Sequence, residues 1–199
     1  LGATKKQPIE HLREYVHAGF NHFGESYVQE ALEKQKALSE FNIDWHFIGS
    51  LQSKKCKQVI GRFHLIHSVD RKNLITELAK RCQAQHCQQQ ILLQVNIGGE
   101  NSKSGCDPKE LPGLIEFVQK QEGLILAGLM TMPPQTDSLK SAAKWFSQLR
   151  ELRNQYQGLV DRKKHSFQHL SMGTSGDFLA AIEEGATIVR LGTVLLGER

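Results

Sequence analysis

The most constraining feature of the sequence is a repeated alternation of short apolar runs with segments of helical periodicity. Eight runs are predicted to be strands, and in the segments between them apolar residues recur every three or four positions. The predicted strands cover residues 1–4, 21–24, 45–48, 63–66, 90–97, 124–130, 167–170 and 187–191. Strands that alternate with helices predict a parallel sheet with right-handed crossovers. Eight such units close a (β/α)8 TIM barrel, and an open doubly wound sheet is the alternative.

A single domain is the expected organisation. The chain has 199 residues, which is enough for one large hydrophobic core, and it shows no low-complexity tract or linker rich in proline and glycine. A TIM barrel of this length lies at the short end of the usual range. We therefore expect residues 1–199 to form one α/β domain.

Charge and hydropathy argue against several classes of protein. The net charge is +4, from 25 basic and 21 acidic residues without a block of like charges, so neither nucleic acid nor a membrane surface is an expected partner. The apolar runs are too short to cross a bilayer. The four cysteines do not resemble the framework of a disulfide-rich secreted domain. With no leader that resembles a signal peptide, a cytoplasmic location is expected.

Small and hydroxyl-bearing residues follow the last two predicted strands. In a barrel the functional site lies at the carboxyl ends of the strands, and phosphate sites recur after strands seven and eight. Ser171, Gly173 and Ser175 follow strand seven, and Gly192 and Thr193 follow strand eight. Glycine allows a ligand to approach the backbone, and hydroxyl and amide groups donate to an anion. Helix capping would explain one such loop, but two loops on adjacent strands predict a phosphate cradle.

Lys5 ends the first predicted strand, which adjoins the eighth strand when a barrel closes. A lysine at a buried strand end can act as a neutral amine, the form that makes a Schiff base with an aldehyde. The alternative is an ordinary surface lysine beside Lys6. A lysine next to a phosphate cradle would hold a phosphate ester that carries an aldehyde. Pyridoxal 5′-phosphate has both groups and is the cofactor we expect.

Arg190 at the end of strand eight is a third candidate. An arginine that points into the mouth of a barrel must meet an anion or a hydrogen-bond acceptor. It could donate to the pyridine nitrogen of the cofactor, which would keep that nitrogen unprotonated and weaken the ring as an electron sink. The alternative is a salt bridge to a nearby carboxylate such as Glu25.

Histidines and cysteines give weaker signals. His46 and His67 fall at strand positions, where a hydrogen-bonded core histidine is the commoner explanation. Cys82 and Cys87 flank His86, but no second pair completes a set of metal ligands, so no metal site is expected.

A series of motifs along the chain resembles the pyridoxal-phosphate homeostasis protein family. The motifs are GESYVQE (24–30), WHFIG (45–49), LQ (51–52), HSVD (67–70), VNI (95–97), KSG (103–105), GLMT (128–131), SMG (171–173) with Ser175, and RLGT (190–193). Each motif is unspecific alone, whereas the ordered series spans almost the whole sequence.

This resemblance implies a barrel like that of alanine racemase, with pyridoxal phosphate on Lys5. By the same match, Arg190 would face the pyridine nitrogen, and Asn96, Met130 and His46 would lie around the ring. The residues implied to hold phosphate are Ser171, Ser175, Gly192 and Thr193. Family members are regarded as carriers or regulators of the cofactor pool that affect the balance of amino and keto acids. No catalytic reaction is established for them, apo-enzymes are possible partners, and a monomer is expected.

The sequence also departs from the family pattern. The family usually has a small polar residue at the position of Lys6. It usually has an asparagine at the positions of Ser26 and Lys54. The family has a helix before strand one, and we expect this barrel to lack it.

The rival hypothesis is an enzyme, such as an amino-acid racemase. Racemisation needs a base on each face of the substrate carbon, and in alanine racemases the second base is a tyrosine from another domain. The three tyrosines of this sequence, Tyr15, Tyr27 and Tyr156, fall in predicted helices. An open cofactor face also admits water, which works against a controlled carbanion. Binding without efficient turnover is therefore the expectation.

Overall fold

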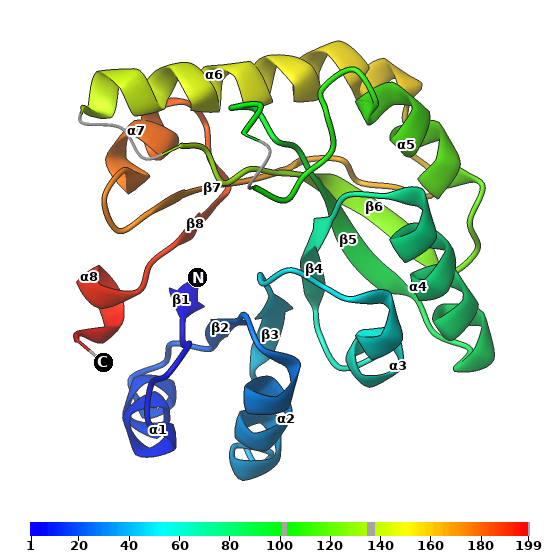
Figure 1. Cartoon of the computed structure of the whole chain (residues 1–199). Helices are drawn as coiled ribbons and strands as arrows, with labels where there is room; N and C mark the ends of the chain where they lie inside the picture. Colours follow the sequence, from blue (N-terminus) through cyan, green and yellow to red (C-terminus); the bar gives the residue numbers. More distant parts are fainter. Residues whose placement is uncertain (101–102, 135–137, 199) are drawn as a thin grey trace.

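Eight parallel strands form one sheet in the order in which they occur in the sequence (Figure 1). The computed structural model describes residues 1–100, 103–134 and 138–198. The strands are β1 (Gly2–Ala3), β2 (His22–Glu25), β3 (Asp44–Phe47), β4 (Leu65–Val69), β5 (Gln89–Gln94), β6 (Leu124–Met130), β7 (His169–Thr174) and β8 (Ile188–Arg190). All neighbouring pairs are parallel.

The first and last strands close the sheet on itself. Gly2 forms a parallel bridge with Leu191. The Ala3 amide donates to the Leu191 carbonyl at 2.7 Å, and the Leu191 amide donates to the Leu1 carbonyl at 2.9 Å. This confirms the predicted (β/α)8 barrel and excludes the open doubly wound sheet, because an open sheet has unpaired edge strands.

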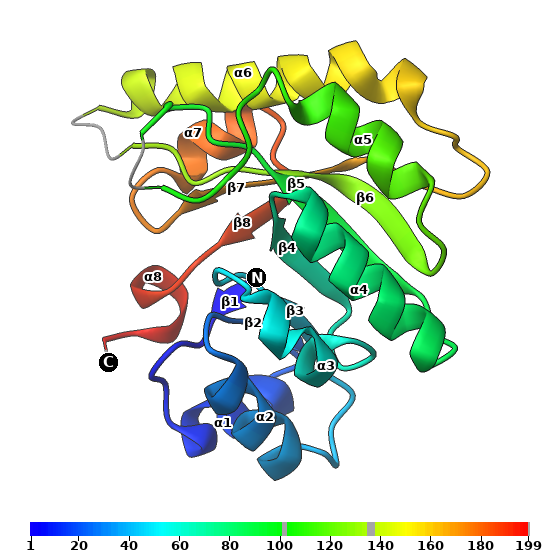
Figure 2. The same cartoon turned by 45° about the vertical axis from the view of Figure 1, so that its right-hand side comes forward.

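Helices cover the outside of the sheet (Figure 2). They are α1 (Ile9–His17), α2 (Val28–Ala37), α3 (Cys56–Val59), α4 (Lys72–Ala84), α5 (Leu111–Gln119), α6 (Leu139–Tyr156), α7 (Phe178–Glu183) and α8 (Thr193–Leu196). Two 3₁₀ turns, η1 (Ser53–Lys55) and η2 (Gln157–Leu159), precede α3 and follow α6. Pro8 is the N-cap of α1, with an extended backbone that leads into the first helical residue, Ile9.

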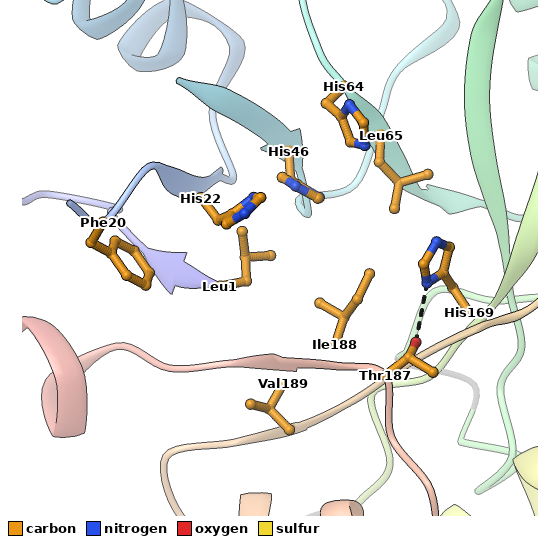
Figure 3. Close-up of a pocket in the computed structure, with 10 residues that line it drawn as sticks. All are labelled: Leu1, Phe20, His22, His46, His64, Leu65, His169, Thr187, Ile188 and Val189. Carbon is orange, nitrogen blue, oxygen red and sulfur yellow. Dashed lines mark hydrogen bonds between the residues drawn. The ribbon is translucent and has the colours of Figure 1, made fainter. Parts of the chain in front are cut away.

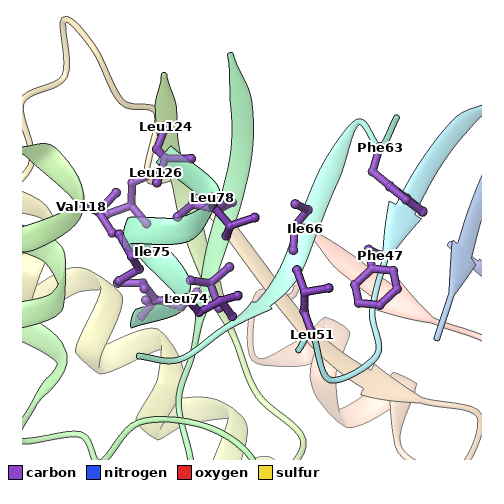
Figure 4. Packing of buried hydrophobic residues seen from close by; sticks show 14 of the residues in the cluster. Phe47, Leu51, Phe63, Ile66, Leu74, Ile75, Leu78, Val118, Leu124 and Leu126 are labelled. Atoms are coloured by element: carbon purple, nitrogen blue, oxygen red, sulfur yellow. The ribbon is translucent and has the colours of Figure 1, made fainter. Parts of the chain in front are cut away.

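The main hydrophobic core lies between the strands and this layer of helices. Figure 4 shows Leu74, Ile75 and Leu78 of α4 facing side chains of α5 and β6. These three residues are fully buried, and each contributes about 1.5–3 kcal/mol to folding by leaving water. A smaller cluster, Leu65, Leu92, Ala127 and Met130, forms a separate core. The helical periodicity of the sequence therefore predicted the correct buried faces.

Strand β7 differs from its prediction. It extends over His169–Thr174, whereas the sequence pattern placed the strand at 167–170 and a loop from Ser171 onward. Pairing with β6, which sets Met130 opposite Ser171, holds this small polar segment in the sheet. The sequence pattern missed it because serine and glycine favour turns. Ser171 and Gly173 are thus strand residues.

Candidate functional site

A cleft of about 300 Å³ opens at the carboxyl ends of the strands. It is lined by Ala3, Ser26, Ile48, Met132, Thr174, Ser175, Gly176, Arg190, Gly192 and Thr193. Four of the predicted site residues are in this set: Ser175, Arg190, Gly192 and Thr193. Its volume is at the lower end of the range for small-molecule sites.

The two glycine-containing loops meet on one side of the cleft. The Gly192 amide donates to the Ser175 hydroxyl oxygen at 3.2 Å, which joins the loop after β8 to the loop after β7. The Asp177 carboxylate accepts from the amide of Thr174 at 2.6 Å and from its hydroxyl at 3.0 Å. These contacts hold the ends of adjacent strands together, and in this arrangement the Gly192 and Thr174 amides are engaged by Ser175 and Asp177.

Lys5 lies on the same rim of the barrel. Only Thr4 separates it from β1, and β1 pairs with the segment that leads into the Gly192 loop. Its side chain is partly buried, and its ammonium lies 5.0 Å from the centre of the Tyr27 ring. The expectation that Lys5 and the loop after strand eight share one rim is confirmed, because adjacent parallel strands end on the same side.

Arg190 is buried in the barrel at 4% exposure. Its Nη1 donates to the Ser171 hydroxyl oxygen at 2.7 Å, and its Nη2 donates to the Thr131 carbonyl at 2.9 Å. Burial lowers the pKa of Arg190 to about 10, so the guanidinium remains charged at neutral pH. The alternative of a salt bridge to Glu25 does not occur, since the Glu25 carboxylate pairs with the Lys34 ammonium at 2.6 Å.

A chain of buried hydrogen bonds continues from Arg190 through the barrel. Ser171 Oγ lies 2.8 Å from His67 Nδ1, and His67 Nε2 lies 2.9 Å from His46 Nδ1. Burial and the nearby His46 and Arg190 lower the pKa of His67 well below its usual value. Burial, followed by the neighbouring histidines, lowers the pKa of His46 to about 3. Both imidazoles are therefore neutral, and the prediction of hydrogen-bonded core histidines is confirmed.

The chain of hydrogen bonds ends at His46, which lines a second cavity at the amino ends of the strands (Figure 3). This cavity of about 340 Å³ is lined by Leu1, Phe20, His22, His46, His64, Leu65, His169, Thr187, Ile188 and Val189. The His46 Nε2 atom is buried and has no hydrogen-bond partner among the residues described. His46 thus lies in the opposite end of the barrel from the Ser175–Gly192 loops.

The lining of the cleft does not include six of the predicted site residues: Lys5, His46, Asn96, Met130, Ser171 and Gly173. Asn96 follows β5, and its side-chain amide donates to the Glu100 carbonyl at 2.9 Å. Met130 is buried in the small cluster that includes Leu65. Gly173 has φ +88°, and an added Cβ would lie only 2.5 Å from the Ala181 Cβ. Its missing side chain allows α7 to pack closely on β7.

The sequence reasoning did not select several residues of the cleft and its support. Ser26 and Met132 line the cleft, and each lies two residues beyond the end of a predicted strand, so position near a strand end was the available signal. Lys34 lies on α2, and the sequence pattern did not indicate that it is buried, because lysines among polar helix residues are usually exposed to solvent.

Two negative findings apply to the residues that the structure describes. None of their helices is both long and apolar enough to span a bilayer. Nor do their histidine, cysteine and acidic side chains form a group of three or more that could bind a metal ion.

A family model described as "Alanine racemase, N-terminal domain" matches residues 7–199. Alanine racemase from Clostridium difficile has the same fold, with a TM-score of 0.73 at 14% identity over 100% of this chain and 50% of that one.

Closer relatives narrow the assignment. Proteins named "Pyridoxal phosphate homeostasis protein" from Aquifex aeolicus and Pseudomonas aeruginosa are 45% and 43% identical over 199 residues, covering all of this chain and 86% and 84% of theirs. The structure of PipY from Synechococcus elongatus, solved with PLP bound, has a TM-score of 0.92 and 32% identity over 99% of this chain and 91% of that one. The chain belongs to the family of pyridoxal phosphate homeostasis proteins.

Proposed function

We propose that this protein binds pyridoxal 5′-phosphate in the cleft, holds it as a Schiff base on Lys5 and thereby carries or buffers the cofactor. The observation that carries the proposal is the position of Lys5 on the same rim as the joined Ser175 and Gly192 loops. The amine of Lys5 would attack the aldehyde carbon, and water would leave. The relatives' name and the ligand in the PipY structure support this ligand.

The residues of the cleft fit the chemical groups of this ligand. Ser175, Gly192 and Thr193 offer hydroxyls and amides for the phosphate at the mouth of the barrel. Arg190 lines the same cleft with a permanently charged donor for the ring nitrogen. Ser171 is engaged by Arg190 and His67, so we propose that it supports Arg190 from within the barrel. We propose that the other predicted residues act through their neighbours; these are His46, Asn96, Met130 and Gly173.

We further propose that the protein is a non-enzymatic, monomeric, cytoplasmic carrier that supplies the cofactor to apo-enzymes and supports the balance of amino and keto acids. Amino-acid racemisation remains the rival. Racemisation requires bases on both faces of the substrate carbon, and Tyr27 contacts the Lys5 side chain itself. Tyr27 would therefore lie on the lysine side of a bound ring. The free cysteines of the described residues fit a reducing compartment.

Absorption spectroscopy of the purified protein tests the proposal. Addition of pyridoxal 5′-phosphate should produce the visible band of a Schiff base, and borohydride should fix the ligand to Lys5 by delivering hydride to its C=N carbon. Lys5→Ala should lose both signals, whereas Lys6→Ala should keep them. A visible band and a borohydride adduct that persist in Lys5→Ala would refute the assignment of Lys5.

The rival activity has its own measurement. An enzyme of the racemase type would exchange the Cα proton of alanine in heavy water. Exchange at a rate that matches catalytic turnover would overturn the non-enzymatic assignment, and a spectrum without exchange supports it.

A further inference from the structure

The two residues that flank Lys5 are both held by one buried ion cluster. Lys34, on α2, is 4% exposed, and its ammonium donates to the Thr4 carbonyl at 2.5 Å. It also donates to Glu25 Oε1 at 2.6 Å and to Glu30 Oε1 at 2.7 Å. An ammonium has three N–H groups, and this geometry gives each of them an acceptor.

The carboxylates of the cluster extend its hold on the same turn. The Thr4 hydroxyl donates to Glu25 Oε1 at 2.6 Å, and the Lys6 amide donates to Glu30 Oε1 at 2.5 Å. Burial raises the pKa of Glu30, but hydrogen bonds from Lys34 and the Lys6 amide outweigh it and leave the pKa below its usual range. Residues 4 and 6 are therefore both anchored by hydrogen bonds, while the charge of Lys5 between them also helps to lower the pKa of Glu30.

The anchored turn has a backbone conformation that needs support. Lys6 has φ +61°, in the left-handed region that costs a residue with a side chain about 1 kcal/mol or more. The Lys6 amide donates to Glu30 in this conformation. The cluster thus supports the conformation of the segment that carries Lys5.

A buried ion cluster contributes little net free energy to folding. Removing charges from water costs several kcal/mol per ion, and apolar side chains of similar size often serve the core equally well. Glu25 shows this cost, because burial raises its pKa despite its partners and its Oε2 has no hydrogen-bond partner among the described residues. The contacts of the cluster converge on the Lys5 turn, which indicates a role in placing that turn.

We infer that Lys34 is a positioning residue for Lys5, acting with Glu25 and Glu30 to fix the turn that presents the Lys5 amine to an aldehyde bound in the cleft. This inference rests on the proposed function. It predicts that the cluster controls the rate of Schiff-base formation and leaves binding of the phosphate and ring almost unaffected, because Lys34 does not line the cleft.

Two ligands separate these effects. Pyridoxal 5′-phosphate reports on capture by Lys5, through the visible band and the borohydride adduct. Pyridoxine 5′-phosphate has the same ring and phosphate but no aldehyde, so its affinity, measured by calorimetry, reports on the cleft alone. Lys34→Met should slow capture at least about tenfold, as expected for a misplaced reacting group, and should leave the affinity for pyridoxine 5′-phosphate within about twofold.

The control variant is Lys36→Met, which removes an exposed lysine from the same helix and should change neither measurement. Glu30→Gln keeps an acceptor for the Lys6 amide and should retain most of the capture rate, whereas Glu30→Ala should lose it. Lys34→Met leaves the buried Glu25 carboxylate without its lysine partner and could therefore fold poorly. In that case the double variant Glu25→Leu with Lys34→Met removes this carboxylate as well and is tested in the same way.

The outcomes are distinct. Equal losses of capture rate and of pyridoxine 5′-phosphate affinity in Lys34→Met would show a merely structural role and overturn the inference, as would an unchanged capture rate. Failure of the proposed function is a different result, because the unaltered protein would then give no Schiff base on Lys5 at all.

Discussion

The Arg190 guanidinium donates to the Ser171 hydroxyl oxygen at 2.7 Å inside the barrel. This contact joins the cleft at the carboxyl ends of the strands to the buried histidine pair. Arginine can only donate hydrogen bonds, so the Ser171 oxygen must be the acceptor. The Ser171 proton is then left for the other partner of this hydroxyl, His67 Nδ1, and this gives an expected direction for the rest of the chain.

The first prediction concerns the tautomers of the two histidines. We expect Ser171, whose oxygen accepts from Arg190, to donate its own proton to His67 Nδ1, the other hydrogen-bond partner of its hydroxyl. His67 must then carry its proton on Nε2 and donate to His46 Nδ1, which leaves the His46 proton on Nε2. Nitrogen-15 NMR of the ligand-free protein should show both Nδ1 atoms unprotonated. Protonated Nδ1 atoms would reverse the assigned direction.

The second prediction is a loss of stability in mild acid. Burial keeps His67 and His46 neutral in the folded protein, whereas in the unfolded chain they take up protons near pH 6.5. The unfolded state therefore binds more protons as the pH falls through 6.5 towards about 3, and stability must fall with it. Each histidine should contribute about 1.4 kcal/mol of loss between about pH 7.5 and about pH 5.5.

Urea unfolding at both pH values checks this effect. His67→Gln should be less stable than the parent at the higher pH but should lose about 1.4 kcal/mol less on acidification. His17→Gln alters an exposed histidine of α1 and should behave like the parent. A pH dependence that is the same in His67→Gln and the parent would contradict a neutral His67 in the folded state.

The third prediction compares the stability effect of a Cβ at two glycines, Gly173, which is closely packed, and Gly176, which is not. Gly173→Ala combines a φ of +88° with a Cβ 2.5 Å from that of Ala181, and it should lower the free energy of unfolding by about 2–4 kcal/mol. A Cβ at Gly176 would meet no atom within 4 Å in the described part of the chain, so Gly176→Ala should unfold like the parent. Thermal unfolding of the two variants provides the comparison, and equal stabilities would refute the packing role of Gly173.

The fourth prediction addresses the phosphate cradle. Ser175→Ala removes a hydroxyl of the cleft that also accepts from the Gly192 amide. The loss of one hydrogen bond to a charged group should weaken binding of pyridoxine 5′-phosphate about tenfold or more. Calorimetry measures this affinity directly, with Ser147→Ala on α6 as the control. Affinity that is equal in the two variants would place the phosphate elsewhere.

The alternation of strands and helices was sufficient to predict the barrel. Apolar periodicity fixes which faces are buried, and parallel strands joined by helices must end on one rim. Because adjacent parallel strands end on the same rim, the sequence pattern also predicted that Lys5 and the Gly192 loop share that rim. The residues that line the cleft at strand ends, such as Ser175 and Thr193, follow from this logic.

The direction in which strand residues point was decided only by the tertiary structure. The pairing of β7 with β8 shifts register between Ser171 and Thr174, so strict alternation along the strand does not tell which side chains face the interior. Ser171, on β7, accepts a hydrogen bond from Arg190 within the barrel, and His46, on β3, lines the cavity at the opposite end. Local sequence carries no signal for such a shift.

What the sequence alone determined is the architecture and the edge at which chemistry can occur, because these depend on periodicity and chain direction, which are local properties. Only the tertiary structure decided which polar groups meet. Lys34 is 30 residues from Thr4 and His67 is 104 residues from Ser171, yet both pairs are in hydrogen-bond contact. Such contacts depend on helix placement and strand register together, and these are set by the packing of the whole barrel.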